Sequence, residues 1–270
     1  MKITFVIGKG GVGKTTVSAL LGLERKPALV FSLDPLPNLA QLFGTVSSFE
    51  PLKVEEGLYV GEVDDVSVKE WWMKRFGDEM GEVISSILKL NETEKRELLR
   101  HIASAPGVAE QFVLLHAIEK AELLGVEELI LDTPPLGPTL HMLRAEREFY
   151  DHLVSAYGLY AKIMSKLGLF DKRVLEIIKS WSELAKKILN AVSSSKYVLV
   201  TTKRKFDKVV GLKGAEEMES FGSSLEMVVL NMVEDGPECV KEPTYWLPKV
   251  KEPTGVEDLK TLATLLRRAC

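Results

Sequence analysis

Residues 2–16 constrain the fold of this chain more than any other stretch. Residues 3–7 are β-branched or aromatic, which predicts a buried strand. A glycine-rich segment follows at 8–16, and the apolar, helix-like residues 17–21 come next. Glycines let a loop curl so that its backbone N–H groups point at phosphate oxygens, and a helix N-terminus adds partial positive charge. The order strand, loop, helix therefore predicts a phosphate-binding loop, or P-loop.

Two kinds of nucleotide suit such a loop. Glycines at positions 8, 10 and 13 also fit the dinucleotide-binding pattern, in which Asp34 lies near the place of the ribose-binding acid. A lysine and a hydroxyl at positions 14 and 15 favour a nucleoside triphosphate with Mg²⁺, because they reach the β- and γ-phosphates and the metal. We predict that the nucleotide contacts Gly10, Gly11, Val12, Gly13, Lys14, Thr15 and Thr16, with Lys14 catalytic and Thr15 a Mg²⁺ ligand.

Composition limits the remaining possibilities. The chain has 270 residues, of which 46% are apolar, enough for one large α/β domain. A net charge of −4 argues against nucleic acid as a partner. The two cysteines predict neither a disulfide nor a metal site, which suits a reducing compartment. A strand that begins at residue 2 leaves no room for a signal peptide, and no apolar run is long enough to span a membrane. We expect a cytoplasmic protein.

Apolar runs and helical periodicity outline the rest of the chain. They predict further strands at 27–33, 57–64, 128–132, 196–202 and 225–231, with helices at 206–221 and 256–268. Longer helical patterns occupy about 66–102 and 141–194, including a capping box at 91–94. We predict a three-layer α/β fold with a mostly parallel central sheet. The chain would be a single ATPase domain, 1–270, with two helical insertions.

Two acids follow predicted strands at the edge of the sheet where ligands bind. Asp34 comes directly after strand 27–33, and Asp132 ends strand 128–132. An apolar strand that ends in aspartate is the usual second metal motif after a P-loop, so we predict that Asp132 holds Mg²⁺ through water. For Asp34, an Asx turn is the alternative to a role in the site, because Asp-Pro commonly forms one.

The segment Gly-Lys-Gly-Gly-Val-Gly-Lys-Thr-Thr at 8–16 resembles the deviant P-loop of a group of dimeric ATPases. The group includes the arsenite-pump ATPases, the tail-anchored-protein targeting ATPases, the Min and Par positioning ATPases and nitrogenase iron protein. The resemblance implies that Lys9 crosses a homodimer interface and contacts the partner's bound ATP, as part of the catalytic machinery. A solvated loop lysine is the alternative.

Other segments resemble the arsenite-pump and targeting branch, in the same order along the chain. Residues 34–44 resemble its Asp-Pro switch, which implies that Asp34 positions the attacking water. A Pro-Gly-x-x-Glu segment at 106–110 also matches. Residues 132–140 resemble the second switch, but the histidine of that family is replaced by Pro138, which counts against an arsenite site.

In the C-terminal third, the resemblance extends to the segments that bind adenine in this branch. Val-Leu-Asn at 229–231 and the loop at 245–259 match the branch's adenine-binding elements, which implies contacts from Asn231 and Pro253. A turn residue at a strand end is an equal alternative for Asn231. Only Cys239 follows Asn231 in the region of the Cys-x-x-Cys pair of eukaryotic targeting ATPases, so no zinc is expected. No thiolates lie in mid-chain for an iron–sulfur cluster.

Three functions remain open for such an ATPase. The first is targeting, in which helical insertions form a groove for apolar transmembrane segments of client proteins, such as tail-anchored membrane proteins. The second is a transport-associated ATPase that drives a membrane pump subunit. The third is a positioning ATPase of Min or Par type. The apolar stripes of the insertions fit either a groove or an ordinary core, because periodicity does not distinguish the two.

Overall fold

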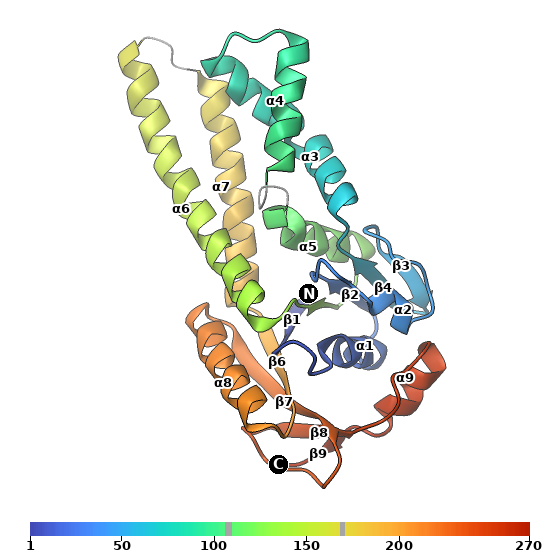
Figure 1. Ribbon diagram of the computed structural model, residues 1–270. Coiled ribbons are helices and arrows are strands. Elements are labelled where there is room, and N and C mark those ends of the chain that lie inside the picture. Colours follow the sequence, from blue (N-terminus) through green and yellow to red (C-terminus); the bar gives the residue numbers. More distant parts are fainter. Residues whose placement is uncertain (106–109, 168–170) are drawn as a thin grey trace. The chain divides into compact units, whose positions relative to one another are not determined.

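The computed structural model describes residues 1–105, 110–167 and 171–270 (Figure 1). The contacts of the chain divide it into two compact units. The sheet unit comprises Met1–Asp64, His116–His141 and Ala191–Cys270, and the helical unit comprises Asp65–Leu115 and Met142–Asn190. The helical unit nearly coincides with the two predicted insertions. That the whole chain is one domain stays a prediction.

Among the described residues, nine strands form one sheet in the order β3-β4-β2-β5-β1-β6-β7-β8-β9. All neighbouring strands are parallel except the two edge pairs, β3 with β4 and β8 with β9, so the predicted mostly parallel sheet is confirmed. The strands are β1 Lys2–Ile7, β2 Ala28–Ser32, β3 Leu52–Glu55, β4 Leu58–Glu62, β5 Glu128–Asp132, β6 Lys196–Thr201, β7 Ser224–Val233, β8 Thr244–Pro248 and β9 Arg267–Arg268.

Both faces of the central strands are buried, which is why they are apolar at nearly every position. On β1, Val6 belongs to one core cluster, whereas Phe5 and Ile7 point to the opposite face because side chains alternate along a strand. All three side chains are fully buried. The helices of the sheet unit are α1 Lys14–Glu24, α2 Leu39–Leu42, α8 Lys205–Ser220 and α9 Val256–Ala263, with most of α5 Val113–Leu124 and the start of α6 Leu136–Leu167.

The end of the chain differs from the prediction of a helix over 256–268. Helix α9 stops at Ala263, and Arg267–Arg268 instead form strand β9. The register places Arg267 opposite Trp246 and Arg268 opposite Tyr245 on β8. Pairing with an open sheet edge thus replaces the last helical turn. The side chains of Leu259 and Leu262 on α9 lie in the core cluster that includes α1.

The helical unit is built from α3 Asp65–Ile87, α4 Glu92–Ser104, the short 3₁₀ segment η1 Glu110–Phe112, most of α6 and most of α7 Lys172–Ser193. The predicted capping box is confirmed, since the Asn91 side chain accepts from Glu94 N–H while the Glu94 side chain accepts from Asn91 N–H. The core of the helical unit holds an aromatic cluster of Trp72, Phe76, Phe112, Phe149 and Trp181. Residues 106–109 of the predicted Pro-Gly-x-x-Glu segment lie outside the described residues.

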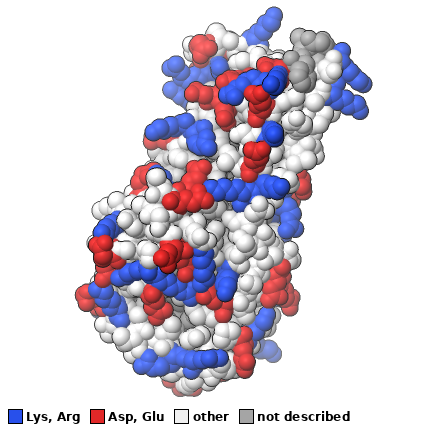
Figure 2. All heavy atoms as spheres, turned by 180° about the vertical axis from the view of Figure 1, so that it is seen from behind, with Lys and Arg blue, Asp and Glu red and all other residues white. Residues whose placement is uncertain are grey.

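Basic and acidic side chains are interspersed on the face of the molecule drawn in Figure 2. This mixture agrees with the near balance of 35 Lys and Arg against 39 Asp and Glu in the sequence. A surface for nucleic acid usually concentrates basic residues on one face or stripe. That nucleic acid is not a partner stays a prediction.

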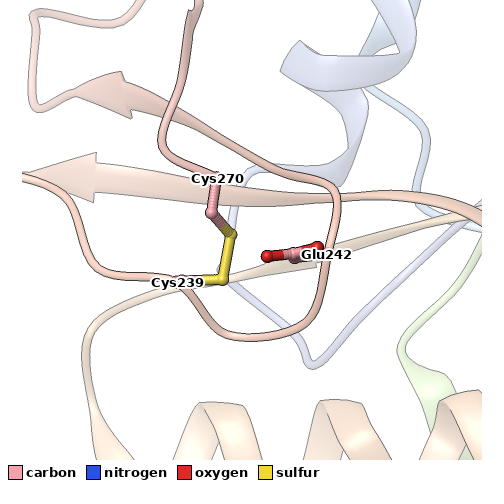
Figure 3. Close-up of side chains that lie close together, drawn as sticks. All are labelled: Cys239, Glu242 and Cys270. Atoms are coloured by element: carbon pink, nitrogen blue, oxygen red, sulfur yellow. A yellow bond between two sulfur atoms is a disulfide. The ribbon is translucent and has the colours of Figure 1, made fainter.

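The prediction that the cysteines form no disulfide is wrong. Cys239, in the loop between β7 and β8, is bonded to Cys270, and the two Cα atoms are 5.8 Å apart (Figure 3). The pairing of β9 with β8 brings these distant positions together, which no cysteine spacing reveals. Cys239, Cys270 and Glu242 offer ligand atoms within 4.8 Å of one another, but bonded sulfurs are not the thiolates that bind metals. The absence of zinc stays a prediction.

Candidate nucleotide site

The loop between β1 and α1 has a shape that only glycine permits at two of its positions. A Cβ on Gly8 would lie 2.3 Å from the carbonyl oxygen of Val200 on β6. Gly13 has a φ of +90°, and a Cβ there would lie 2.1 Å from the Asn231 side chain. Helix α1 begins directly after Gly13, so its first N–H groups face the loop. Local sterics thus place an anion-binding backbone at the carboxyl edge of the sheet.

This loop borders a cavity of about 430 Å³. Several predicted site residues share its lining: Gly10, Gly11, Gly13, Lys14, Thr15, Thr16, Asp34, Asn231 and Pro253. The lining also includes residues that the sequence analysis did not single out. Leu36, Asn38 and Leu42 belong to the first predicted switch, Pro135 to the second, and Pro248, Val250, Lys251 and Glu252 to the predicted adenine loop. Met232 and Leu262 lie outside these predicted segments. Three predicted residues lie elsewhere, and their positions are described below: Val12, Asp132 and Lys9.

Lys14 contributes positive charge to the lining of this cavity. It is the first residue of α1, and only 7% of it is exposed. Burial lowers the pKa of Lys14, while the charge of Asp132 and, to a smaller extent, that of Asp34 oppose this shift. The two carboxylates favour the charged form of the buried ammonium. A charged Lys14 can attract the phosphate groups of a ligand.

Asp132 lies beneath the loop and is only 1% exposed. Its Oδ1 accepts from Ser18 Oγ and its Oδ2 accepts from Ser32 Oγ, both at 3.1 Å. Burial raises its pKa to about 6, and a hydrogen bond with the Thr15 side chain is the largest opposing influence. Asp132 is therefore connected to the cavity through Thr15, the predicted Mg²⁺ ligand. Its role at the metal, through water, stays a prediction.

Asp34 fits both interpretations that the sequence left open, an Asx turn and a place in the site. Its Oδ1 accepts from the backbone N–H of Leu36 at 3.0 Å, which is an Asx turn. The same residue lines the cavity together with Lys14 and Thr15. The turn therefore holds the carboxylate at the edge of the site rather than removing it from the site. Glu62 also holds the segment after Asp34, because its Oε1 accepts from Ala40 N–H at 2.7 Å.

Asn231 is not at a strand end, because β7 continues to Val233. Its side chain is 7% exposed and donates a hydrogen bond to the Val12 carbonyl at 2.9 Å. Val12 itself buries its side chain in the core cluster with α1. Asn231 thus ties the sheet to the P-loop backbone while it lines the cavity with Pro253. Contact of either residue with adenine stays a prediction.

Lys9 lies outside the cavity lining and is paired within its own chain. Its Nζ is 2.8 Å from Asp207 Oδ1 and lies 5.0 Å from the ring centroid of Phe206. The hydrogen bond from Lys9, followed by that from Thr202, lowers the pKa of Asp207. Sequence reasoning missed Asp207. The sequence signal that could have identified Asp207 is its place in the first turn of the helix that follows strand β6. This is the same edge of the sheet as Asp34 and Asp132.

Residues 1–233 match the family described as anion-transporting ATPase. A protein of Aquifex aeolicus provisionally named arsenical pump-driving ATPase 2 is 29% identical over 255 residues, covering 86% of this chain and 80% of that protein. An ATPase ASNA1 homolog of Entamoeba dispar is 30% identical, and an ATPase GET3 of Ajellomyces dermatitidis 29% identical, each over 62% of this chain. The chain spans about half of these two relatives, 54% and 48% respectively.

Proposed function

Because this chain belongs to the anion-transporting ATPase family and is an ATP-hydrolysing enzyme, we propose that it hydrolyses ATP with Mg²⁺ in the cavity at the P-loop. We propose further that it acts as a homodimer and uses hydrolysis to bind or target apolar segments of client proteins. The single observation that carries the first part is the shared lining of one cavity by the glycine-rich loop, Lys14, Thr15 and Asp34.

The residues around the cavity fit a triphosphate and its metal. The loop backbone and the start of α1 offer N–H groups, and Lys14 adds an ammonium, so the oxygens of a bound triphosphate would meet donors on several sides. The Thr15 hydroxyl would hold Mg²⁺ directly, and Asp132 would hold it through water. Bound Mg²⁺ would neutralise phosphate charge in the transition state. Asp34 would orient the attacking water from the edge of the cavity.

Asp34→Asn tests this site directly. We expect hydrolysis to fall about 100-fold, the size of loss typical for a positioned acid–base group, while binding of a fluorescent ATP analogue is retained. Asp151→Asn, the same change at an exposed position of α6, is the control and should leave hydrolysis unchanged. Hydrolysis at the normal rate in Asp34→Asn would remove Asp34 from the catalytic role.

Exposed apolar side chains on α6 support binding of an apolar partner. Val154, Tyr157, Leu159 and Ile163 are between 41% and 59% exposed, beyond the buried Leu153. In contrast, the α7 stripe of Val174, Ile177, Ile178, Trp181 and Ile188 is buried, and so are Trp72 and Phe76 on α3. Most of the described stripe residues therefore form core, while exposed apolar side chains that a client could contact remain on the second half of α6 and at Ile87 on α3.

Co-purification with the Asp34→Asn protein in the presence of ATP tests the client role. Enrichment of single-span proteins with C-terminal apolar helices, lost when Leu159 and Ile163 are changed to Ser, would support targeting. A matched pair of exposed polar residues on the same helix, Asp151 and His152, changed to Ser is the control. Recovery of the ATPase with nucleotide alone would contradict the client role.

A pump-driving role is the second candidate, because the Aquifex relative that this chain covers to 80% is named for such a role. A positioning ATPase of Min or Par type would need a free amphipathic C-terminal helix for a membrane or a basic face for DNA. Helix α9 buries Leu259 and Leu262 in the core, which counts against a positioning role.

No helix among the described residues has the length and apolar character needed to cross a bilayer. Location in the cytoplasm stays a prediction, and the disulfide removes the cysteine argument for it.

A further inference from the structure

The ion pair between Lys9 and Asp207 connects the P-loop to the start of α8. Asp207 accepts from Lys9 through Oδ1 at 2.8 Å and from Thr202 Oγ1 through Oδ2 at 2.6 Å. The Thr202 hydroxyl in turn accepts from the backbone N–H of Arg204 at 3.2 Å. Both oxygens of the carboxylate are therefore occupied, and the position of Asp207 is set by the end of β6 and the first turn of α8.

The two partners differ in how firmly they are held. The Asp207 side chain is 4% exposed, whereas the Lys9 side chain is 36% exposed and lies on the glycine-rich loop. A buried carboxylate needs a cation or hydrogen-bond donors to remain charged, so Asp207 retains Lys9. Lys9 has a flexible stem and access to solvent, so its ammonium has freedom to move to a stronger anion. The Phe206 ring, 65% exposed, adds a weak cation–π contact on the outer side.

A phosphate of another subunit would compete with Asp207 for this ammonium, because reaching across an interface draws Nζ away from the buried carboxylate that lies 2.8 Å from it. We propose that Asp207 is a positioning residue that holds Lys9 within its own subunit until the triphosphate bound to a second copy of this chain takes the ammonium. Asp207 thereby sets the nucleotide concentration at which the dimer forms. The inference rests on the proposed function, in which Lys9 reaches the partner's nucleotide. It adds the competing acid that restrains Lys9 before the partner arrives.

The test measures dimerisation by analytical ultracentrifugation as a non-hydrolysable ATP analogue is titrated with Mg²⁺. In Asp207→Asn the half-maximal analogue concentration should fall about threefold to tenfold, as expected when a partly exposed ion pair that competes with binding is lost. Phe206→Leu, which removes only the ring, should shift it in the same direction by a smaller factor. A higher half-maximal concentration in Asp207→Asn would show that Asp207 prepares Lys9 for the partner, and would overturn the proposal.

Controls separate this inference from the proposed function. Glu82→Gln breaks an exposed ion pair with Arg173 on the helical unit and should leave the titration unchanged. Lys9→Ala should abolish analogue-dependent dimerisation and should make the added Asp207→Asn change silent. If Lys9→Ala dimerises and hydrolyses ATP normally, the dimer part of the proposed function fails. If Lys9→Ala fails to dimerise while Asp207→Asn and Phe206→Leu match the unmodified protein, only the inference fails.

Discussion

Asp132 in the sheet unit and Glu146 in the helical unit are each about 1% exposed, yet their surroundings differ. Asp132 accepts from two serine hydroxyls, and burial raises its pKa to about 6. Neither oxygen of Glu146 has a hydrogen-bond partner among the residues that the structure describes, and burial raises its pKa to about 8. The sheet unit thus keeps a buried acid close to its charged form, whereas the helical unit keeps one neutral.

The comparison shows that burial alone does not identify a functional acid. Around Asp132, Ser18, Ser32 and Thr15 form a set of hydroxyl donors beside a buried lysine, which is how polar groups are organised for an ionic ligand. Glu146 lies on the buried side of α6 with Leu143 and Leu153, where the same charge would be destabilising. The surroundings of Asp132 support its proposed role at a ligand, whereas a charged Glu146 would destabilise the helical unit.

The largest expected effect is on the sheet unit. Lys14→Ala should lower ATP hydrolysis by at least about 100-fold, because it removes the buried cation that would face the phosphates in the proposed site. Steady-state phosphate release measures the change. Lys213→Ala on α8, outside the cavity lining, is the control. Retention of more than a tenth of the activity would show that the hydroxyls and backbone alone stabilise the transition state.

The next effect is on the helical unit and depends on pH. Burial raises the folded-state pKa of Glu146 from 4.5 to about 8, so the stability contributed by the neutral form is full below about pH 4.5 and is lost as pH rises to about 8. Glu146→Gln should therefore increase the free energy of unfolding at pH 7 by about 3 kcal/mol and flatten its pH dependence in that window.

Urea denaturation between pH 5 and 8.5 measures this change. Glu148→Gln, an exposed glutamate on the same helix, is the control and should leave the curve unchanged. If Glu146→Gln destabilises the protein at pH 7, the carboxylate of Glu146 has a partner that stabilises its charge, and the contrast with Asp132 fails.

The smallest expected effect tests the hydroxyl set. Ser32→Ala removes one donor to Asp132 and should lower the free energy of unfolding by about 1 kcal/mol, with a several-fold loss of ATP hydrolysis. Ser48→Ala, at an exposed hydroxyl that donates to the Glu50 carbonyl, is the control. Loss of stability without loss of hydrolysis would assign Ser32 to the fold rather than to the site.

The contrast between the two units also explains which features could be predicted from the sequence. Strands such as 128–132 and the P-loop were predictable, because their apolar runs and glycines are local in the sequence. The short strand β3 was missed, since Leu52–Glu55 is only partly apolar and forms by pairing with β4. The Asp207 contact, the Cys239–Cys270 bond and the burial of Glu146 all depend on which segments meet in space. Periodicity on one helix does not contain that information.

The disulfide determines whether proteolytic cleavage near the C-terminus releases a fragment. It closes a covalent ring from residue 239 to residue 270, and this ring contains β8, α9 and the cavity-lining Val250, Lys251, Glu252 and Pro253. A protease that cleaves between 249 and 255 would therefore open the ring without releasing a fragment. The nicked protein would keep its mass on a non-reducing gel and separate into two pieces only after a thiol is added.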